Sequence, residues 1–224
     1  LVLHGADVVV GDLAEVAVRK GVSGAAWTFT FEGYDPPNER LRESLCTVGN
    51  GYFATRGAAP ESTAGRLHYP GTYAAGVYNR LEDVVAGVPT EHESLVNLPN
   101  WLPLTFRIDG GDWFDVDAVE LLSYRQTFDL RSAVLTRDLR FRDDAGRTTT
   151  VRQSRFAAMH LAHVAALETT IVAEDWSGSI RIRSMIDGDV RNSMVERYRD
   201  LASDHLRGLT KFALSEDSVL LAVE

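Results

Sequence analysis

The stretch Leu104-Thr105-Phe106-Arg107-Ile108-Asp109 alternates apolar and polar side chains at every position. Successive side chains of a β-strand point to opposite faces, so this period of two predicts a strand with one buried face and one wet face. The same alternation recurs over residues 135–142 and 180–186. Residues 162–172 are apolar on both faces up to Thr169, which predicts a more buried strand.

Short polar turns separate the predicted strands. Asp109-Gly110-Gly111-Asp112 and residues 143–146 have the composition of hairpin loops, and residues 176–178 and 215–217 separate later strands. Strands of up to ten residues joined by such turns predict a mainly β, antiparallel sandwich. Residues 35–101 hold six of the 7 prolines, so we expect long loops with short strands there.

The first residues have a different pattern, which predicts a short N-terminal β-α segment over residues 1–20. A β-branched run ends at Val10, and Asp12 with Glu15 three residues later resembles a helix capping box. Residues 21–26 are expected to be a linker, and residues 27–224 to form the β-domain. The chain begins at Leu1 and stops inside an apolar run, so we expect it to be a piece of a longer polypeptide.

Composition places the chain among globular proteins. Of its 224 residues, 45% are hydrophobic and 25% charged, and the formal net charge is −9. An acidic chain without a basic cluster is a poor partner for nucleic acid or an anionic membrane, so we expect neither. Cys46 is the only cysteine, which excludes a disulfide framework and a cysteine-based zinc site and makes the reducing cytoplasm the expected location.

Several short motifs have both a chemical and a structural interpretation. Gly49-Asn50-Gly51-Tyr52-Phe53-Ala54 matches a dinucleotide fingerprint formally, but no helical period follows it, so a glycine-shaped turn is favoured. His160 and His163 have a spacing that suits metal binding only on a helix, so packing or surface roles are favoured. The close carboxylates are interpreted as solvated turn residues; they are Glu91/Glu93, Glu174/Asp175 and Asp187/Asp189. No metal or cofactor is therefore expected.

The four tryptophans could stack on sugar rings or fill the core; they are Trp27, Trp101, Trp113 and Trp176. Trp101 is the strongest candidate for sugar contact, because it lies beside the amides of Asn97 and Asn100 in a loop stiffened by Pro99 and Pro103. A stiff loop that carries amides and an aromatic ring suits a preorganised rim of a substrate site.

The chain from Trp27 onward resembles the N-terminal β-domain of glycoside hydrolase family 65, which includes maltose, trehalose and kojibiose phosphorylases and some α-glucoside hydrolases. The matching stretches lie in the same order over about 200 residues. They are residues 45–57, 70–79, 95–101, 131–137, 186–192 and 197–199. Residues 5–15 resemble the C-terminal end of a haloacid-dehalogenase-type phosphatase or β-phosphoglucomutase.

The resemblance implies an antiparallel super-sandwich similar to galactose mutarotase, joined by a helical linker to an (α/α)6 barrel. In the family the barrel carries the general-acid glutamate, and phosphate or water attacks with inversion, so inorganic phosphate is the implied co-substrate of a phosphorylase. No catalytic residue is transferred to this chain. The implied partners are its own barrel, an α-linked glucose disaccharide and a second copy in a homodimer.

The resemblance also suggests that this domain lends a loop to the substrate rim. Residues 97–101 are the first candidate, and Asp187, Asn192 and Tyr198 are the second. Three alternatives stay open: an independent carbohydrate-binding module, a domain for dimerisation and support, and a mutarotase-like enzyme. The last would need a His/Glu acid–base pair in the cleft, for which the sequence has no spaced motif.

Overall fold

The computed structural model describes residues 27–193, 203–215 and 218–223. The predicted β-α segment of residues 1–20 and the linker lie outside the described residues. The prediction of a mainly β, antiparallel domain is confirmed, since every strand pair in the structure is antiparallel.

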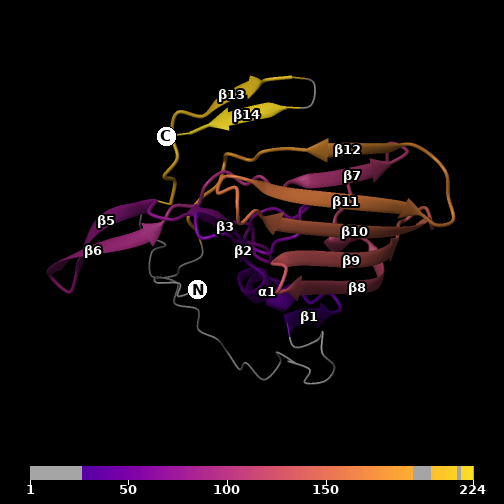
Figure 1. Ribbon diagram of the computed structural model, residues 1–224, viewed down its shortest axis with the longest axis horizontal. Coiled ribbons are helices and arrows are strands. Elements are labelled where there is room, and N and C mark those ends of the chain that lie inside the picture. Colours follow the sequence, from indigo (N-terminus) through magenta and orange to yellow (C-terminus); the bar gives the residue numbers. More distant parts are fainter. Residues whose placement is uncertain (1–26, 194–202, 216–217, 224) are drawn as a thin grey trace.

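The largest element is a twisted five-stranded sheet with the order β1-β8-β9-β10-β11 (Figure 1). Its strands are β1 (Thr28–Glu32), β8 (Glu120–Asp129), β9 (Val134–Arg142), β10 (Thr148–Ala157) and β11 (Ala165–Ala173). The predicted hairpin loop at residues 143–146 is confirmed, because it joins β9 to β10 and Asp143 accepts a hydrogen bond from the Gly146 N–H.

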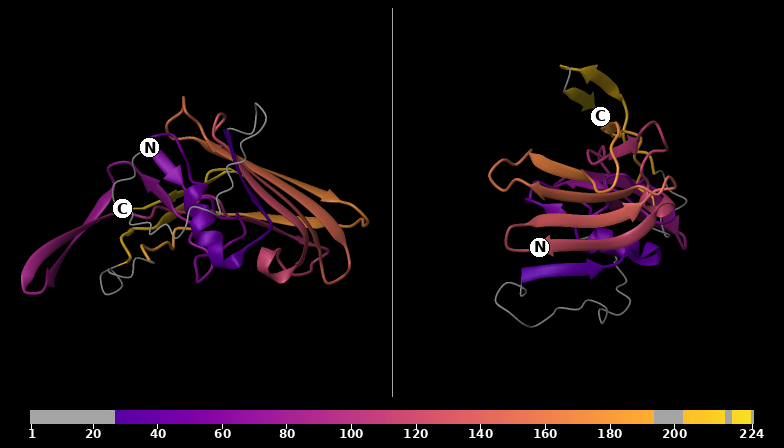
Figure 2. Two further views of the ribbon diagram at one scale, coloured as in Figure 1. Left: turned by 90° about the horizontal axis from the view of Figure 1, so that it is seen from below. Right: turned by 90° about the vertical axis from the view of Figure 1, so that its right-hand side faces the viewer.

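Smaller antiparallel units surround this sheet. The strand β7 (Leu104–Ile108), which carries the alternating stretch, pairs with β12 (Ile180–Ser184). The remaining units are β2 (Val48–Gly49), β3 (Phe53–Thr55) and β4 (Thr72–Ala74); the hairpin β5 (Tyr78–Val85) and β6 (Val88–Leu95); and the hairpin β13 (Thr210–Ala213) and β14 (Val219–Ala222). Figure 2 shows the β5–β6 hairpin projecting away from the body of the domain.

One face of the main sheet is covered and forms the core, and we call it the inner face. At one end, β7 and the short helix η4 (Val116–Ala118) cover aromatic side chains of β9, with Phe106 and Phe114 stacked at 5.0 Å between ring centroids. At the other end, Cys46 and Val48 pack against Phe128. Burial of these two apolar clusters stabilises the sheet at roughly 25 cal/mol per Å² of apolar surface.

A polar row separates the two apolar clusters on the inner face. Gln126, Arg137, Gln153 and Thr169 lie directly opposite one another on β8, β9, β10 and β11. Arg155 follows in the next inner-face row of β10, opposite Leu135. Polar groups out of water need partners, so the segment that covers this row must supply them.

Residues 57–61, which we call the strap, supply partners to three of these strands. The Gly57 carbonyl accepts a hydrogen bond from Gln126 Nε2 at 3.3 Å, and the Ala58 carbonyl accepts one from Arg155 Nη1 at 2.6 Å. Glu61 accepts two from Arg137. The strap therefore lies across the inner face and closes the middle of the core.

Three expectations need correction. Residues 35–101 contain a helix, α1 (Glu39–Leu45), which begins after prolines in the first positions of the 3-10 helix η3 (Pro36–Asn38), where proline's fixed φ suits a helix start. The strand β11 is not buried on both faces; it lies at the sheet edge, and Val172 is exposed. Residues 109–112 form a turn, but not a hairpin loop, because β7 pairs with β12 rather than β8.

Candidate functional site

A cleft with a volume of about 460 Å³ lies where three distant segments meet. One wall is the outer side of the strap with residues 62–66, a second is the loop before β7, and a third is the segment after β12. Its charged and amide residues are Arg40, Glu61, Arg66, Asn97, Asn100, Arg183, Asp187, Asp189 and Arg191. No tryptophan lines it among the described residues.

Two hydrogen-bonded contacts hold the second and third walls together. Asn100 and Asp187 form an isolated antiparallel bridge, in which each backbone N–H donates to the other's carbonyl, at 2.7 and 2.8 Å. Asn192 Oδ1 accepts a hydrogen bond from the Asn97 N–H at 2.7 Å, and Asn192 Nδ2 donates to the Leu95 carbonyl. Both loops are thereby fixed against each other as a preorganised wall.

The structure brings together four of the six residues predicted for the substrate rim. Asn97, Asn100 and Asp187 line the cleft, and Asn192 lies behind it as the residue that clamps Asn97. Tyr198 lies outside the described residues. The amide of Asn97 is engaged in structure, because its Oδ1 accepts from the Thr72 N–H at 3.0 Å and its Nδ2 donates to the Arg191 carbonyl at 3.3 Å.

Trp101 does not line the cleft and instead makes a hydrogen bond within the fold. Its indole Nε1 donates to the Thr55 hydroxyl at 2.9 Å, and Thr55 is fully buried. The Thr55 hydroxyl in turn lies 3.4 Å from that of Thr72 on the neighbouring strand β4. The indole is half-buried and holds the loop against the β2-β3-β4 sheet.

Sequence reasoning missed the arginines of the cleft. Arg66, Arg183 and Arg191 are exposed, and Arg183 lies over the Trp113 ring at 4.2 Å from its centroid. Arg40 reaches the cleft from α1 and donates to the Gly65 carbonyl. These residues come from four separate segments, so no spacing in the chain could have grouped them.

Two buried carboxylates of the domain, Glu61 and Glu39, are engaged by arginines. A glycosidase acid is a carboxyl of raised pKa that can reach the glycosidic oxygen. Glu61 is held by Arg137, and its side chain is 1% exposed. Burial raises the pKa of Glu39, but that side chain is ion-paired with Arg42 at 3.2 Å and does not line the cleft.

A His/Glu pair does exist away from the cleft, although the sequence had no motif for it. His68 Nδ1 lies 2.9 Å from Glu43 Oε1, and His68 Nε2 lies 3.1 Å from the Tyr34 hydroxyl and 3.5 Å from Asp117. Burial alone would lower the pKa of His68, but the hydrogen bond and charge of Glu43 outweigh it and raise the pKa. His68 and Glu43 are buried and do not line the cleft, so this pair joins α1 to its neighbours.

Two further findings concern the described residues only. They contain no group of three or more His, Cys, Asp or Glu side chains arranged to hold a metal ion. They also contain no helix with the length and apolar character needed to cross a membrane.

Comparison with known proteins identifies relatives of this chain. Residues 29–224 match the family described as glycosyl hydrolase family 65, N-terminal domain. An uncharacterised glycosyl hydrolase of Mycobacterium tuberculosis is 60% identical over 198 residues, covering 88% of this chain and 15% of that protein. The kojibiose phosphorylase of Caldanaerobacter subterraneus is 32% identical over 183 residues, covering 81% of this chain and 22% of that enzyme.

A solved structure shares the fold. A candidate kojibiose phosphorylase from the human microbiome superposes with a TM-score of 0.73 over 88% of this chain and 25% of that chain. At 19% identity this likeness concerns the fold alone. The chain thus spans between 15% and 25% of the length of these three proteins.

Proposed function

This chain belongs to the glycosyl hydrolase family 65 N-terminal domain family, and on that basis we propose that it is the non-catalytic N-terminal domain of an inverting α-glucoside phosphorylase or hydrolase. The proposed substrates of the whole protein are disaccharides such as trehalose, maltose or kojibiose, with inorganic phosphate as co-substrate of a phosphorylase. The general acid is assigned to an (α/α)6 barrel outside these residues, and the protein to the cytoplasm.

This proposal rests on the ion pairs that engage two buried carboxylates of the domain. Glu61 is neutralised inside the domain by Arg137, and Glu39 by Arg42, so neither can protonate a glycosidic oxygen. Burial raises the pKa of Glu39, but Glu39 does not line the cleft, and this arrangement suits support and positioning better than bond cleavage. The buried His68–Glu43 pair lies outside the cleft, which argues against the mutarotase-like alternative.

We further propose that the cleft wall of residues 97–101 and 186–192 faces the substrate or the catalytic barrel. The Asn100–Asp187 bridge and the Asn192 clamp support this role, because they fix the wall before a ligand arrives and so reduce the ordering cost of binding. Trp101 then acts by positioning this loop through Thr55.

The proposed lack of catalytic activity in this domain can be tested by comparing the 224-residue chain with a longer protein that contains it. We expect the chain alone to release neither glucose nor glucose 1-phosphate from trehalose, maltose or kojibiose, with or without phosphate. Activity of the chain alone would contradict the proposal. Isothermal titration with the same sugars tests the carbohydrate-binding alternative, since the supporting role predicts no strong binding.

The rim assignment is tested in the longer protein. Asp187→Ala is expected to raise the KM for the disaccharide about tenfold, which corresponds to the loss of one hydrogen bond to a charged group. Asp144→Ala, in the exposed β9–β10 turn, is the matched control. Equal kinetics of the two variants would remove Asp187 from the rim.

We also propose that the protein forms a homodimer, as the resemblance implies. Sedimentation analysis of the chain tests this.

A further inference from the structure

One face of the projecting β5–β6 hairpin is exposed and acidic, and we call it the acidic face. Glu82 and Glu91 lie directly opposite each other, and Glu93 follows on the same face, opposite Arg80. Arg80 is the one cation on this face of the described hairpin, and it lies 3.6 Å from Glu91 and 3.5 Å from Glu93. Like charges directly opposite one another destabilise a sheet, so the Glu82/Glu91 pair is unfavourable in the isolated hairpin.

Turn geometry fixes the register of this hairpin. Ala86 and Gly87 at its tip have φ values of 51° and 82°, which suit a two-residue turn that matches the twist of the strands. Tyr78 and Val84 lie on the acidic face and are 47% and 65% exposed. A two-stranded hairpin is marginally stable alone in water, so a partner packed on this face would stabilise it.

The β7–β12 pair carries a face of the opposite charge, which we call the basic face. Phe106 is buried in the core, so the alternation of β7 places Arg107 on the other side. Arg181 lies directly opposite Arg107, and Arg183 follows on the same face. Arg107 and Arg183 both lie over the Trp113 ring, at 5.0 and 4.2 Å from its centroid.

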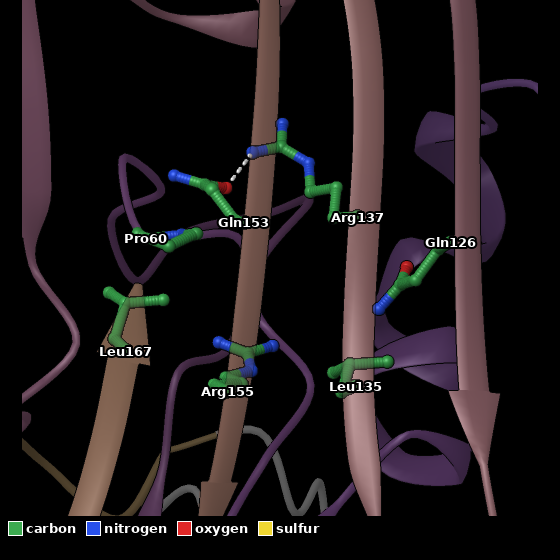
Figure 3. Close-up of a pocket in the computed structure, with 7 residues that line it drawn as sticks. All are labelled: Pro60, Gln126, Leu135, Arg137, Gln153, Arg155 and Leu167. Atoms are coloured by element: carbon green, nitrogen blue, oxygen red, sulfur yellow. Dashed lines mark hydrogen bonds between the residues drawn. The ribbon is translucent and has the colours of Figure 1, made fainter. Parts of the chain in front are cut away.

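Other arginines of the sheet strands have carboxylate partners within the domain. Arg137 is paired with Glu61 and also donates to Gln153 (Figure 3), and Arg140 is paired with Glu174. In the part of the chain that the structure describes, no carboxylate forms an ion pair with an arginine of the basic face. The basic face therefore offers unpaired positive charge to a partner.

The acidic and basic faces belong to different ends of the domain. Figures 1 and 2 show the tip of the β5–β6 hairpin pointing away from β7 and β12. The two faces are thus complementary in charge and available to each other between two copies of the chain. Each holds a cross-strand pair of like charges, Glu82/Glu91 or Arg107/Arg181, whose repulsion the other face would offset.

We propose that the acidic face of one copy binds the basic face of a second copy, and the reverse, so that a two-fold dimer forms through two identical contacts. The charges set the orientation of the two copies, and the exposed Tyr78 and Val84 add apolar area to the contact. This inference names the surfaces of the proposed homodimer and rests on that proposal; it does not depend on the proposed catalytic activity of the longer protein.

Charge reversal on the two faces tests the contact. Glu82→Arg with Glu91→Arg makes the acidic face basic, and Arg181→Glu with Arg183→Glu makes the basic face acidic. In sedimentation equilibrium of the chain at low ionic strength, each double variant alone should raise the dimer dissociation constant roughly tenfold or more. An equimolar mixture of the two double variants should dimerise again, because each hairpin then meets a face of opposite charge.

Arg152→Glu, on the exposed face of the main sheet, is the matched control and should leave the association unchanged. If the double variants do not fold, Arg181→Glu alone serves, because it places a carboxylate opposite Arg107 and should not destabilise the domain. A dimer that these reversals leave intact would overturn the inference and keep the homodimer. A chain that stays monomeric at low ionic strength would overturn both.

Discussion

Glu61 and Arg137 form a two-pronged ion pair inside the domain, with Oε1 2.6 Å from Nη2 and Oε2 2.9 Å from Nη1. The two side chains are 1% and 6% exposed. Gln153 Oε1 accepts from the same guanidinium at 2.9 Å, so β9, β10 and the strap are joined at one group. The cleft reaches this ion pair, because Pro60 and Glu61 of the strap line it.

Removal of one partner of this ion pair should lower the free energy of unfolding substantially. We expect Glu61→Gln to lower the free energy of unfolding by about 3–5 kcal/mol, because it leaves Arg137 charged and unpaired in the core. Urea denaturation monitored by tryptophan fluorescence measures the change. The control is Glu174→Gln, which disrupts the exposed ion pair with Arg140 and should have a much smaller effect. Similar losses for both variants would contradict the assigned role.

The His68–Glu43 pair predicts a pH dependence of stability. The pKa of His68 is raised in the folded state, so the folded protein binds this proton more tightly than the unfolded chain does. Its contribution is fully present below the unfolded pKa of about 6.5 and is lost as the pH rises through the folded pKa.

Urea denaturation at a series of pH values from mildly acidic to mildly alkaline measures this effect. The free energy of unfolding should fall as the pH rises, and His68→Gln should flatten that part of the curve. His163→Gln changes an exposed histidine that contacts Tyr52, and it should leave the curve unchanged. If the slope persists in the His68 variant, the pH dependence must come from another titratable group.

Trp101→Phe tests the loop contact with the buried Thr55. The change keeps an aromatic ring and removes the Nε1 donor, so we expect a loss of about 1 kcal/mol of stability from one hydrogen bond. Thermal unfolding of the chain gives this number. In the longer protein the same variant should affect disaccharide affinity less than Asp187→Ala does, and the reverse order would return Trp101 to the substrate site.

Gly57 allows the close approach between the strap and the end of α1. A Cβ at this position would lie 2.6 Å from Cys46 Cβ, so Gly57→Ala must displace one of the two segments. We expect a destabilisation of about 1–3 kcal/mol, as for other overpacked cores. Gly65→Ala is the control, because its nearest neighbour would be a carbonyl oxygen at 3.9 Å. Chemical denaturation of both variants measures the two changes in the free energy of unfolding.

Local patterns predicted the strands well, because side-chain alternation is a property of consecutive residues. The alternation of residues 104–109 corresponds to β7, and the turn at residues 143–146 joins β9 to β10. The same patterns failed for the burial of β11, since exposure depends on whether a further strand lies beside it. They also missed α1, because the prolines before it suggested a loop although they suit the start of a helix.

The candidate site shows the same limit. Asn97 and Asn100 were identified from one loop, and Asp187 and Asn192 from another, but nothing in the spacing placed the two loops in contact. Asn97 and Asn192 are 95 residues apart in the chain. The arginines of the cleft were missed for this reason, since each comes from a segment of its own.

The sequence by itself determined the antiparallel β-character of this domain, its acidic charge and the residues that define its family, because these follow from composition and from the order of neighbouring side chains. Tertiary structure alone decided that Glu61 compensates Arg137 and that Asn100 meets Asp187. The physical reason is that charge compensation and burial depend on distances between segments, and these exist only once the strap has closed over the sheet.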